Sequence, residues 1–369
     1  MKIAYVFPSL AVWGGIERIL TDKMNWLCRH GCEVAIITTD QGDHPTVYDL
    51  DPRIRHIDLG ICFHHQYRYR RLHRLFDLWQ RNRLFGRRLN VQLKQLQPDI
   101  LVTAANGLAG LITQTRRQIP LVVESHTICQ QLIGEGRLQA LRRWRLLWQL
   151  KRADVLVALT EGDAEQWRRH VQNVVVIPDM VHVPERLQQA TLKSRNVLFV
   201  GRLEPQKQVF RLIEAWRTVW NTHRDWTLTV CGDGSQREQL QQFIAEAAAE
   251  GIELVSPTRH VFSLYANTAM LVLTSSYEPF GLVMAEAMLC GVPVVAFDCP
   301  YGPRTIVSDG CDGLLVAPNS TAALAQAIAR LMDDAGLRQR LGSAAAQNAR
   351  RFEADQVMPL WEKLFQKRF

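Results

Sequence analysis

Short apolar runs alternate with longer amphipathic segments along this chain, and the whole cycle occurs twice. In the first half, Lys2–Phe7 and Glu33–Thr38 are typical of strands, and Ile16–His30 between them is typical of a helix that ends at Gly31. The other strand candidates of this half are Ile54–Leu59, Ile100–Thr103, Leu121–Glu124, Val155–Ala158 and Val174–Ile177. Apolar strands that alternate with helices predict a parallel sheet covered on both faces.

The cycle restarts after a polar, proline-bearing stretch at 179–194, which we interpret as a linker. A strand is predicted at Asn196–Val200 and a helix at Val209–His223. Later strand candidates are Thr227–Cys231, Ile252–Leu254, Met270–Leu273 and Val294–Ala296. Because 369 residues exceed what one core usually organises, we predict two doubly wound, Rossmann-like α/β domains that face a central cleft.

The net charge of +8 is concentrated in the first half of the chain. Residues 1–177 hold 25 Lys and Arg against 16 Asp and Glu, whereas residues 178–369 hold 19 against 20. The excess of nine positive charges indicates an anionic partner for the first domain, and both nucleic acid and a membrane surface fit.

Composition also bears on the compartment. The eight cysteines form no C-x-x-C pair or zinc-type spacing, which predicts a reducing, cytosolic environment. The apolar start of the chain is too short for a signal peptide, and no apolar run reaches the roughly 20 residues that span a bilayer.

Two loops at predicted strand ends have residues suited to a phosphate. Gly14 and Gly15 let the backbone approach a ligand at the start of a helix, although the same pair also fits an ordinary tight turn. Arg202 and Lys207 follow the strand Asn196–Val200 and could clamp a diphosphate, or they could be two solvated loop charges.

Two further candidates are more ambiguous. His126 follows the strand Leu121–Glu124 and is either a cleft residue or a hydrogen-bonded structural histidine. Asp49 and Asp51 form an Asp-x-Asp pair, a pattern that can hold a divalent metal, but they precede Pro52 in a loop and we interpret them as a turn. We therefore expect no metal and no cofactor.

The sequence E-P-F-G-L-V-M-A-E at 278–286 places two carboxylates around a turn. The turn leads into a helix at Leu282–Leu289, whose first N–H groups are free to bind an oxygen-rich anion. Glu278 precedes the turn and Glu286 lies one helical turn beyond Leu282, about 6 Å deeper. Two acids that flank such a turn fit a ligand with hydroxyls at both ends and a diphosphate between them, which describes a nucleotide sugar. The alternative is an amphipathic helix with a solvated acid.

With this E-x7-E motif the chain resembles retaining glycosyltransferases of family 4, which have the GT-B fold, over essentially its whole length. The supporting elements are Gly14-Gly15-Ile-Glu17, Val200-Gly-Arg-Leu203 with Lys207, and a turn of the Asn-Gly type at Asp312–Val316. The resemblance implies a hexosyltransferase that uses a nucleotide-sugar donor, and family frequency favours UDP.

The resemblance also implies a role for each matched residue. Arg202 and Lys207 would hold the donor diphosphate and take the place of a metal ion. Glu286 would bind the ribose, and Glu278 the donor sugar with the backbone of Phe280, Gly281 and Leu282. Gly15 would close on the donor phosphate and His126 would line the sugar site. We expect Glu278, His126, Arg202 and Lys207 to act in catalysis. Asp179 differs from the Asn that many relatives have after Ile-Pro.

Residues 64–89 contain eight arginines, one acid and interleaved aromatic residues, and residues 137–152 are similar in character. Basic, aromatic-rich helices are typical of proteins that bind an anionic membrane, although solvated helices with core aromatics remain an alternative. No nucleic-acid-binding motif accompanies them. Family members that use lipid-linked or lipopolysaccharide acceptors dock in this way, so the resemblance implies a cytoplasmic enzyme, peripheral on the inner face of the plasma membrane.

These expectations assign residues 1–178 to a basic acceptor-side domain, 195–352 to a donor-binding domain and 353–369 to a helix that crosses back to the first domain. The predicted function is transfer of a sugar to a membrane-associated glycan or lipid-linked acceptor in lipopolysaccharide, capsule or exopolysaccharide synthesis. The alternatives are a nucleotide-sugar epimerase of the same fold and a catalytically silent partner in a membrane glycan assembly.

Overall fold

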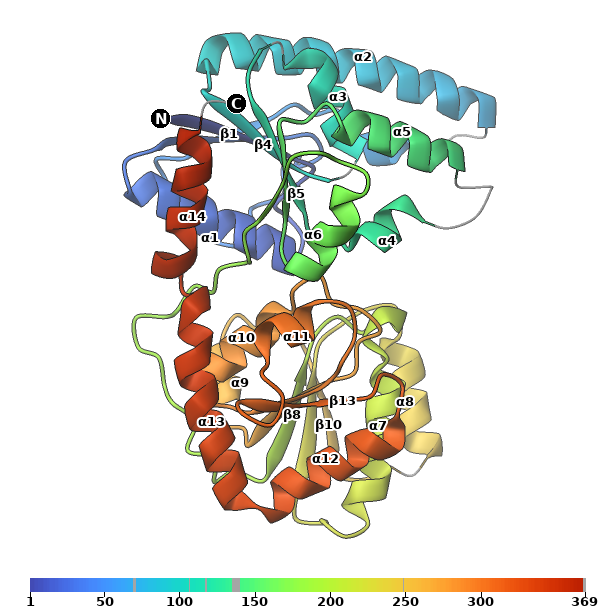
Figure 1. Ribbon diagram of the computed structural model, residues 1–369. Helices are drawn as coiled ribbons and strands as arrows, with labels where there is room; N and C mark the ends of the chain where they lie inside the picture. Colours follow the sequence, from blue (N-terminus) through green and yellow to red (C-terminus); the bar gives the residue numbers. More distant parts are fainter. Residues whose placement is uncertain (69–70, 106, 117, 135–139, 248, 368–369) are drawn as a thin grey trace. The chain divides into compact units, whose positions relative to one another are not determined.

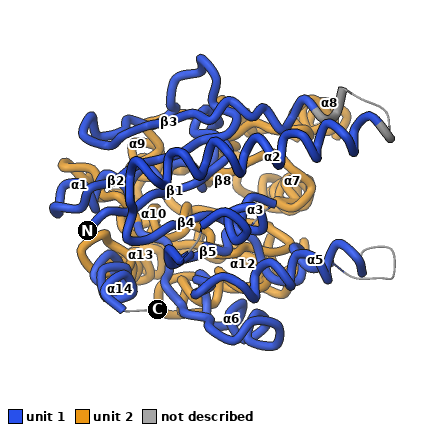
Figure 2. Tube along the Cα trace, turned by 90° about the horizontal axis from the view of Figure 1, so that it is seen from above, with its two compact units in different colours: residues 1–180, 357–369 blue, residues 181–356 orange. Residues whose placement is uncertain are grey.

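The computed structural model describes residues 1–367 except 69–70, 106, 117, 135–139 and 248. It contains two compact units: Met1–Met180 together with Val357–Phe369, and Val181–Gln356 (Figure 2). Residues 181–194, which we interpreted as a linker, thus belong to the second unit, and the segment that returns to the first unit starts at Val357 rather than at 353.

The first unit is built on a parallel sheet of seven strands in the order β3-β2-β1-β4-β5-β6-β7. Val6 of β1, an inner strand, lies opposite Ile37 of β2 on one side and Thr103 of β4 on the other. The strands are β1 (Lys2–Phe7), β2 (Glu33–Thr38), β3 (Arg55–Asp58), β4 (Ile100–Ala104), β5 (Leu121–Ser125), β6 (Val155–Ala158) and β7 (Val174–Val176). The inner strands are buried almost throughout because helices cover both faces of the sheet.

Helices α2, α3, α5 and α6 pack on one face of this sheet, against Ala4 and Val6, and α1 and α14 lie on the other face (Figure 1). The helices are α1 (Gly15–Arg29), η1 (Phe63–Arg68), α2 (Arg71–Leu96), α3 (Gly107–Thr115), α4 (Cys129–Ile133), α5 (Ala140–Leu150), α6 (Glu161–Arg168) and α14 (Ala354–Gln366). The long helix α2 contributes Phe85, Leu89 and Leu93 to the core.

The second unit is built on a parallel sheet of six strands in the order β10-β9-β8-β11-β12-β13. The strands are β8 (Asn196–Val200), β9 (Thr227–Cys231), β10 (Ile252–Val255), β11 (Met270–Leu273), β12 (Val294–Phe297) and β13 (Gly313–Val316). The last of these corrects the sequence analysis, which interpreted Asp312–Val316 as a turn, because Gly313–Val316 pairs with β12 at the sheet edge.

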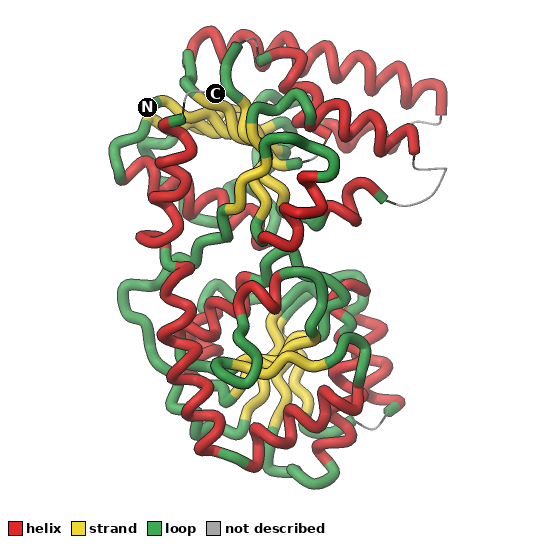
Figure 3. Tube along the Cα trace, viewed as in Figure 1, coloured by secondary structure: helices red, strands yellow, loops and turns green. Residues whose placement is uncertain are grey.

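Helices cover both faces of the second sheet as well, with α7, α8 and α12 on one face and α9, α10 and α13 on the other (Figure 1, Figure 3). They are η3 (Pro205–Lys207), α7 (Val209–Trp220), α8 (Arg237–Glu246), α9 (Val261–Ala266), α10 (Leu282–Leu289), α11 (Gly302–Ile306), α12 (Thr321–Asp333), α13 (Ala335–Ala349) and η4 (Arg350–Phe352). Two doubly wound α/β domains, as the alternating pattern predicted, are therefore confirmed.

Candidate functional site

The strand order of the second unit reverses direction between β8 and β11. From β8 the chain continues outward to β9 and β10, whereas β11 starts the other half of the sheet. Ligands of doubly wound folds bind at the carboxyl ends of strands at such a switch point. The loop after β8 holds Arg202 and Lys207, and the loop after β11 holds Glu278.

Hydrogen bonds join these two loops directly. Thr274 Oγ1 donates to the carbonyl of Lys207 at 2.8 Å, and Ser276 N donates to the carbonyl of Gln206 at 2.8 Å. In the reverse direction, Gln206 Nε2 donates to the carbonyl of Tyr277 at 2.7 Å. The loop that holds the cations and the loop that holds the acid are thus positioned as one piece.

Lys207 and Glu278 form an ion pair at the junction of the loops. Lys207 Nζ lies 2.5 Å from Glu278 Oε1, and Ser275 Oγ donates to the same oxygen at 2.6 Å. The side chain of Glu278 is 5% exposed and that of Lys207 13% exposed. Among the described residues no donor reaches Glu278 Oε2, so this oxygen is available to a ligand hydroxyl.

Arg202 is exposed and, within the described part of the chain, makes no side-chain hydrogen bond or ion pair. Its loop is nevertheless fixed. Leu203 N donates to the carbonyl of Asp233 at 2.8 Å, and the carboxylate of Glu204 accepts from Ser235 N at 3.0 Å and Ser235 Oγ at 2.6 Å. These bonds to Ser235 lower the pKa of Glu204. Arg202 therefore presents an unpaired cation on an anchored loop.

The turn between Glu278 and α10 has the backbone that the sequence predicted. Gly281 has φ of +98°, a conformation that favours glycine, and it precedes a helix whose amino end has no side-chain cap. Phe280 is buried with its ring edge-on to that of Phe352, at 5.1 Å between centroids. The turn is thus fixed from the side of the core.

Glu286 lies on α10 and is 1% exposed. Its Oε2 accepts a hydrogen bond of 2.8 Å from the hydroxyl of Tyr265, a fully buried residue of α9. Glu286 is therefore held by protein through Tyr265, and its contact with a ribose stays a prediction.

The glycine pair in the first unit lies at the start of α1. A Cβ on Gly15 would meet no atom within 4 Å, whereas a Cβ on Gly14 would lie 2.1 Å from Glu17 Oε2. The space beside Gly15 is thus open, and contact of this glycine with a donor phosphate stays a prediction.

His126 follows β5 and belongs to a buried charged cluster in the first unit. Its Nε2 lies 3.1 Å from Glu124 Oε2, and the same oxygen accepts from Lys23 Nζ at 2.5 Å. Lys23 Nζ also lies 3.8 Å from the centroid of the Trp361 ring on α14. The side chain of His126 is only 4% exposed. Lys23 and Trp361 were missed by the sequence analysis, although a lysine inside the apolar stripe of α1 was a visible signal.

Burial changes the acidity of two carboxyl groups in this cluster. For Glu124, burial opposes ionisation, but Lys23 and His126 outweigh it and the pKa falls to about 2. For Asp179, burial dominates and raises the pKa to about 6, although the charges of His126 and Lys23 act in the opposite direction.

The Asp-x-Asp pair contacts Arg53 in its own loop and Asn25 of α1. Asp51 Oδ2 pairs with Arg53 at 2.8 Å, and the carbonyl of Asp49 accepts from Asn25 Nδ2 at 2.8 Å. Hydrogen bonds to Arg53 hold the pKa of Asp51 well below its usual range. The ranges that the structure describes contain no group of three or more His, Cys, Asp or Glu side chains arranged to hold a metal ion.

Two protein families match consecutive parts of the chain. The family described as "Glycosyltransferase Family 4" matches residues 13–183, and "Glycosyl transferases group 1" matches residues 185–348. The chain belongs to glycosyltransferase family 4. This confirms the family inferred from the E-x7-E motif and identifies the protein as a glycosyltransferase.

This chain is also similar to individual known proteins, and the length of the similar region differs among them. Exopolysaccharide phosphotransferase SCO2592 of Streptomyces coelicolor is 32% identical over 282 residues, which cover 74% of this chain but 29% of that protein. Amylovoran biosynthesis glycosyltransferase AmsD of Erwinia amylovora is 24% identical, with 98% of this chain and 99% of AmsD covered. The crystal structure of Anabaena HepE in complex with UDP and glucose has a TM-score of 0.74 at 20% identity, with 99% of both chains covered.

In this family 4 glycosyltransferase, the predicted site residues fall into two groups. In the second unit Lys207 and Glu278 are in contact, Arg202 lies on the same loop as Lys207, and the turn at 280–282 leads into α10, on which Glu286 is buried. Gly14, Gly15 and His126 lie in the first unit. None of the helices that the structure describes is both long enough and apolar enough to cross a membrane.

The raised pKa of Asp179 predicts a pH-dependent cost of folding. The folded carboxyl titrates near pH 6 and the unfolded one near 3.8, so the folded state binds more protons between these values and loses stability as pH rises through 6. Asp179→Asn removes the cost. We expect the free energy of unfolding to rise by about 1–3 kcal/mol at pH 8 and to be unchanged near pH 4.

Denaturant unfolding at both pH values measures this effect. Asp49→Asn, a change at an exposed acid of the same unit, serves as the matched control and should leave stability unaltered at both. Equal stability of Asp179→Asn and the parent at pH 8 would show that the buried carboxyl carries no such cost.

Proposed function

We propose that this glycosyltransferase is a retaining enzyme that moves a sugar from a nucleotide-sugar donor, expected to be a UDP-sugar, to a membrane-associated glycan or lipid-linked acceptor. The observation that carries the donor assignment is the unpaired cation Arg202 on the same loop as Lys207, which pairs with Glu278 at the switch point of the second unit. The complex of HepE with UDP and glucose supports the same ligand class. The name of AmsD, an amylovoran biosynthesis enzyme, supports a role in surface polysaccharide synthesis.

The geometry favours a particular division of work during transfer. Arg202 and Lys207 stabilise the negative charge that develops on the leaving diphosphate. As the bond between the sugar and the diphosphate breaks, the acceptor hydroxyl bonds to the same carbon on the same face, and its proton passes to the leaving phosphate oxygen. Glu278 has one oxygen held by Lys207 and Ser275, which suits hydroxyl binding by the other oxygen better than nucleophilic attack.

Arg202 and Lys207 should differ in what their loss does to the protein. Arg202→Gln is expected to weaken UDP binding about tenfold or more, since a hydrogen bond to a charged group contributes roughly 1.5–3 kcal/mol. It should leave the melting temperature unchanged because the side chain has no described partner. Lys207→Met should lower both UDP affinity and stability, the latter by about 3 kcal/mol, because it leaves Glu278 buried without its cation.

Calorimetric titration with UDP, GDP and ADP, combined with thermal unfolding, tests these effects. Arg217→Gln on α7 replaces another exposed arginine of the same unit and serves as the control. Failure of the parent to bind any of the three nucleotides contradicts the proposal. Hydrolysis of a panel of nucleotide sugars then distinguishes a transferase from an epimerase and from a silent partner.

We also predict that the reaction needs no divalent metal, because Arg202 and Lys207 would supply positive charge to the diphosphate. Transfer and donor hydrolysis should proceed at the same rate in EDTA as in magnesium. Radiolabelled sugar transfer after dialysis against EDTA measures this. Activity that disappears on chelation and returns with magnesium or manganese would refute the prediction.

We further propose that the enzyme is peripheral on the cytoplasmic face of an anionic membrane and has no nucleic-acid partner. Of the segments predicted to dock, residues 69–70 and 137–139 lie outside the described residues. On α2, the side chains of Leu75, Phe76 and Trp79 are 65%, 59% and 52% exposed. Such exposure favours an interfacial role for these residues over a place in the core. Of the Phe and Trp residues of α2, Phe85 is the one that is buried in the core.

Helix α5 repeats the arrangement. Leu141, Trp144 and Trp148 are 76%, 63% and 38% exposed, and the two tryptophan rings stack at 6.4 Å. Arginines lie beside the aromatic rings of both helices: Arg83 is 4.7 Å from the ring of Trp79, and Arg152 is 3.5 Å from that of Trp148. Cations next to exposed indoles suit a surface of anionic headgroups over apolar chains.

Binding to vesicles should therefore have a salt-sensitive and a salt-resistant part. Each cation near the membrane surface contributes on the order of 1 kcal/mol to binding, and salt screens this contribution. Salt does not screen the contribution of the indole rings. Trp79→Gln with Trp144→Gln should abolish the binding that persists at high salt. Leu360→Gln, at a 44% exposed leucine of α14, is the control and should bind as the parent does.

Co-sedimentation with vesicles of zwitterionic lipid, with and without an anionic lipid, measures both parts. Binding by the double tryptophan variant that equals binding by the parent at every salt concentration would refute docking through these helices.

A further inference from the structure

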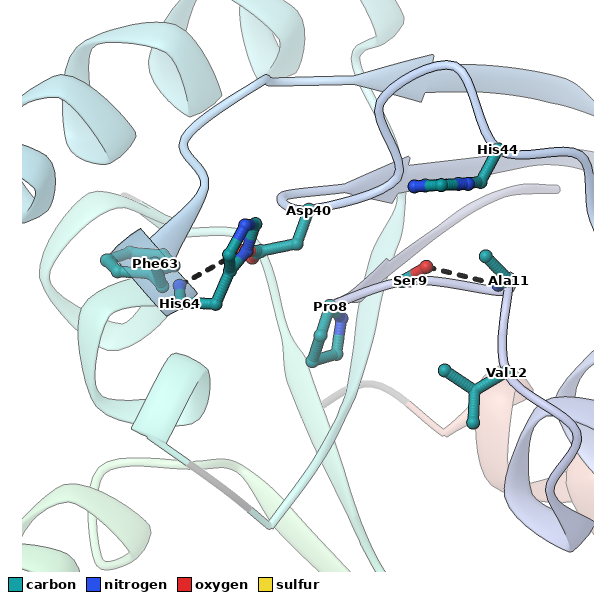
Figure 4. A pocket seen from close by; sticks show the side chains of 8 residues that line it. All are labelled: Pro8, Ser9, Ala11, Val12, Asp40, His44, Phe63 and His64. Atoms are coloured by element: carbon teal, nitrogen blue, oxygen red, sulfur yellow. Dashed lines mark hydrogen bonds and ion pairs between the residues drawn. The ribbon is translucent and has the colours of Figure 1, made fainter. Parts of the chain in front are cut away.

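His64 and His126 both lie against an acid in the first unit, but they differ in burial. His64 lines a pocket of about 580 Å³ with Asp40, and its Nδ1 lies 2.9 Å from Asp40 Oδ1 (Figure 4). The side chain of His64 is 60% exposed, whereas that of His126, with Nε2 3.1 Å from Glu124 Oε2, is 4% exposed. Burial of such a pair costs free energy unless other charges offset it.

The offsetting charge is the ammonium group of Lys23 on α1. Lys23 is 2% exposed, and its Nζ lies 2.5 Å from the same Glu124 oxygen that His126 approaches. The ring of Trp361 on α14 covers Nζ at 3.8 Å from the ring centroid, and the ring of Tyr5 on β1 lies at 5.9 Å. One carboxylate and two aromatic faces therefore hold the ammonium group in place.

The register of the sheet explains why these groups meet. Tyr5 of β1 pairs with Val102 of β4, which pairs with Val122 of β5, two residues before Glu124. Side chains two residues apart on a strand point to the same face, so Tyr5 and Glu124 share one face of the sheet. Lys23 on α1 reaches that face, and α14 covers it from outside (Figure 1).

A purely structural role does not account for this cluster. Replacement of a buried ion pair by apolar residues is often neutral or stabilising, so burial of Lys23 with Glu124 is not by itself a gain in stability. What the pair supplies is a carboxylate oxygen in a fixed place beside the imidazole, since Lys23 and His126 approach the same oxygen from different elements.

The fixed oxygen decides the tautomer of His126. Neither ring nitrogen has a hydrogen-bond partner among the described residues, so the charge of Glu124 at 3.1 Å from Nε2 is what orients the ring. A negative oxygen at Nε2 favours the ring proton there, which leaves Nδ1 as an acceptor in the neutral imidazole. A buried acceptor without a partner is costly, so Nδ1 is suited to a hydroxyl that a ligand brings.

We propose that Glu124 and Lys23 are positioning residues: Glu124 holds the His126 ring with its proton on Nε2, and Lys23 holds Glu124. Nδ1 then accepts a hydrogen bond from a hydroxyl of the donor sugar. The identity of that ligand rests on the proposed function, but the orientation of the ring does not. Trp361 keeps Lys23 on the carboxylate, so α14 supports the same arrangement.

Three variants of the full chain test the proposal: Glu124→Gln, Lys23→Met and the two changes combined. Nitrogen-15 NMR of histidine-labelled protein at pH 8 reports which ring nitrogen carries the proton, and His126→Asn identifies the signal. The parent should have the proton on Nε2, and Glu124→Gln should have a mixture of tautomers because the charge is lost while the shape is kept. His64, whose acid is Asp40, is the internal reference and should be unchanged.

Kinetics then separate positioning from stability. Hydrolysis of the nucleotide sugar that the parent cleaves fastest should fall about tenfold or more in all three variants, with UDP affinity unchanged, because the sugar is the part expected to meet His126. The combined variant leaves no unpaired buried charge, so its melting temperature should exceed that of Lys23→Met. Asp154→Asn, which breaks the ion pair with Arg116 in the same unit, is the matched control for stability and should hydrolyse the donor as the parent does.

The outcomes separate this proposal from the proposed function. Recovery of hydrolysis together with stability in the combined variant would show that the pair is only structural. A parent spectrum with a proton on Nδ1, or an unchanged His126 signal in Glu124→Gln, would also overturn the proposal. The spectrum needs no donor, so a parent that binds no nucleotide refutes the proposed function while the tautomer of His126 still decides this inference.

Discussion

The ion pair between Lys207 and Glu278 sets the conditions for the rest of the donor site. Two charges this deeply buried are tolerated only when they are paired and hydrogen-bonded, so the loops after β8 and β11 have to meet. The bonds from Thr274, Ser276 and Gln206 enforce that meeting through the backbone. The result is a neutralised pair with one free carboxylate oxygen.

Because Glu278 offsets only one of the two cations, the group of Arg202, Lys207 and Glu278 keeps a net positive charge. At a distance, the attraction of a diphosphate by Lys207 and its repulsion by Glu278 would largely cancel. As an ion pair they offer donors and acceptors at short range, while Arg202 attracts the anion. Recognition of a sugar and recognition of a phosphate can therefore share one site without the acid repelling the ligand.

Strand ends could be predicted from the sequence, and so could the residues at them. Arg202, Lys207 and Glu278 follow apolar runs directly, and a parallel sheet places such ends along one edge. The interior position of Glu286 could not be predicted, because it depends on how α10 rotates against Tyr265 of α9. Lys23 was visible as a lysine in an apolar stripe, but its partners Glu124 and Trp361 could not be predicted, because they lie on β5 and α14. The strand β13 was missed because four residues after a turn signal carry too little pattern.

Composition also overstated the charge that α2 presents to a membrane. Of the arginines in 64–89 whose side chains are described, Arg81 and Arg88 donate to backbone carbonyls of residues 59–61 and so hold the segment that precedes η1. Arg83 lies on the ring of Trp79, among the exposed apolar side chains. A single indole buries up to about 200 Å², which at roughly 25 cal/mol per Å² is comparable to several surface cations. Docking through α2 would therefore depend on its aromatic residues at least as much as on its charge, while Arg81 and Arg88 attach that helix to residues 59–61.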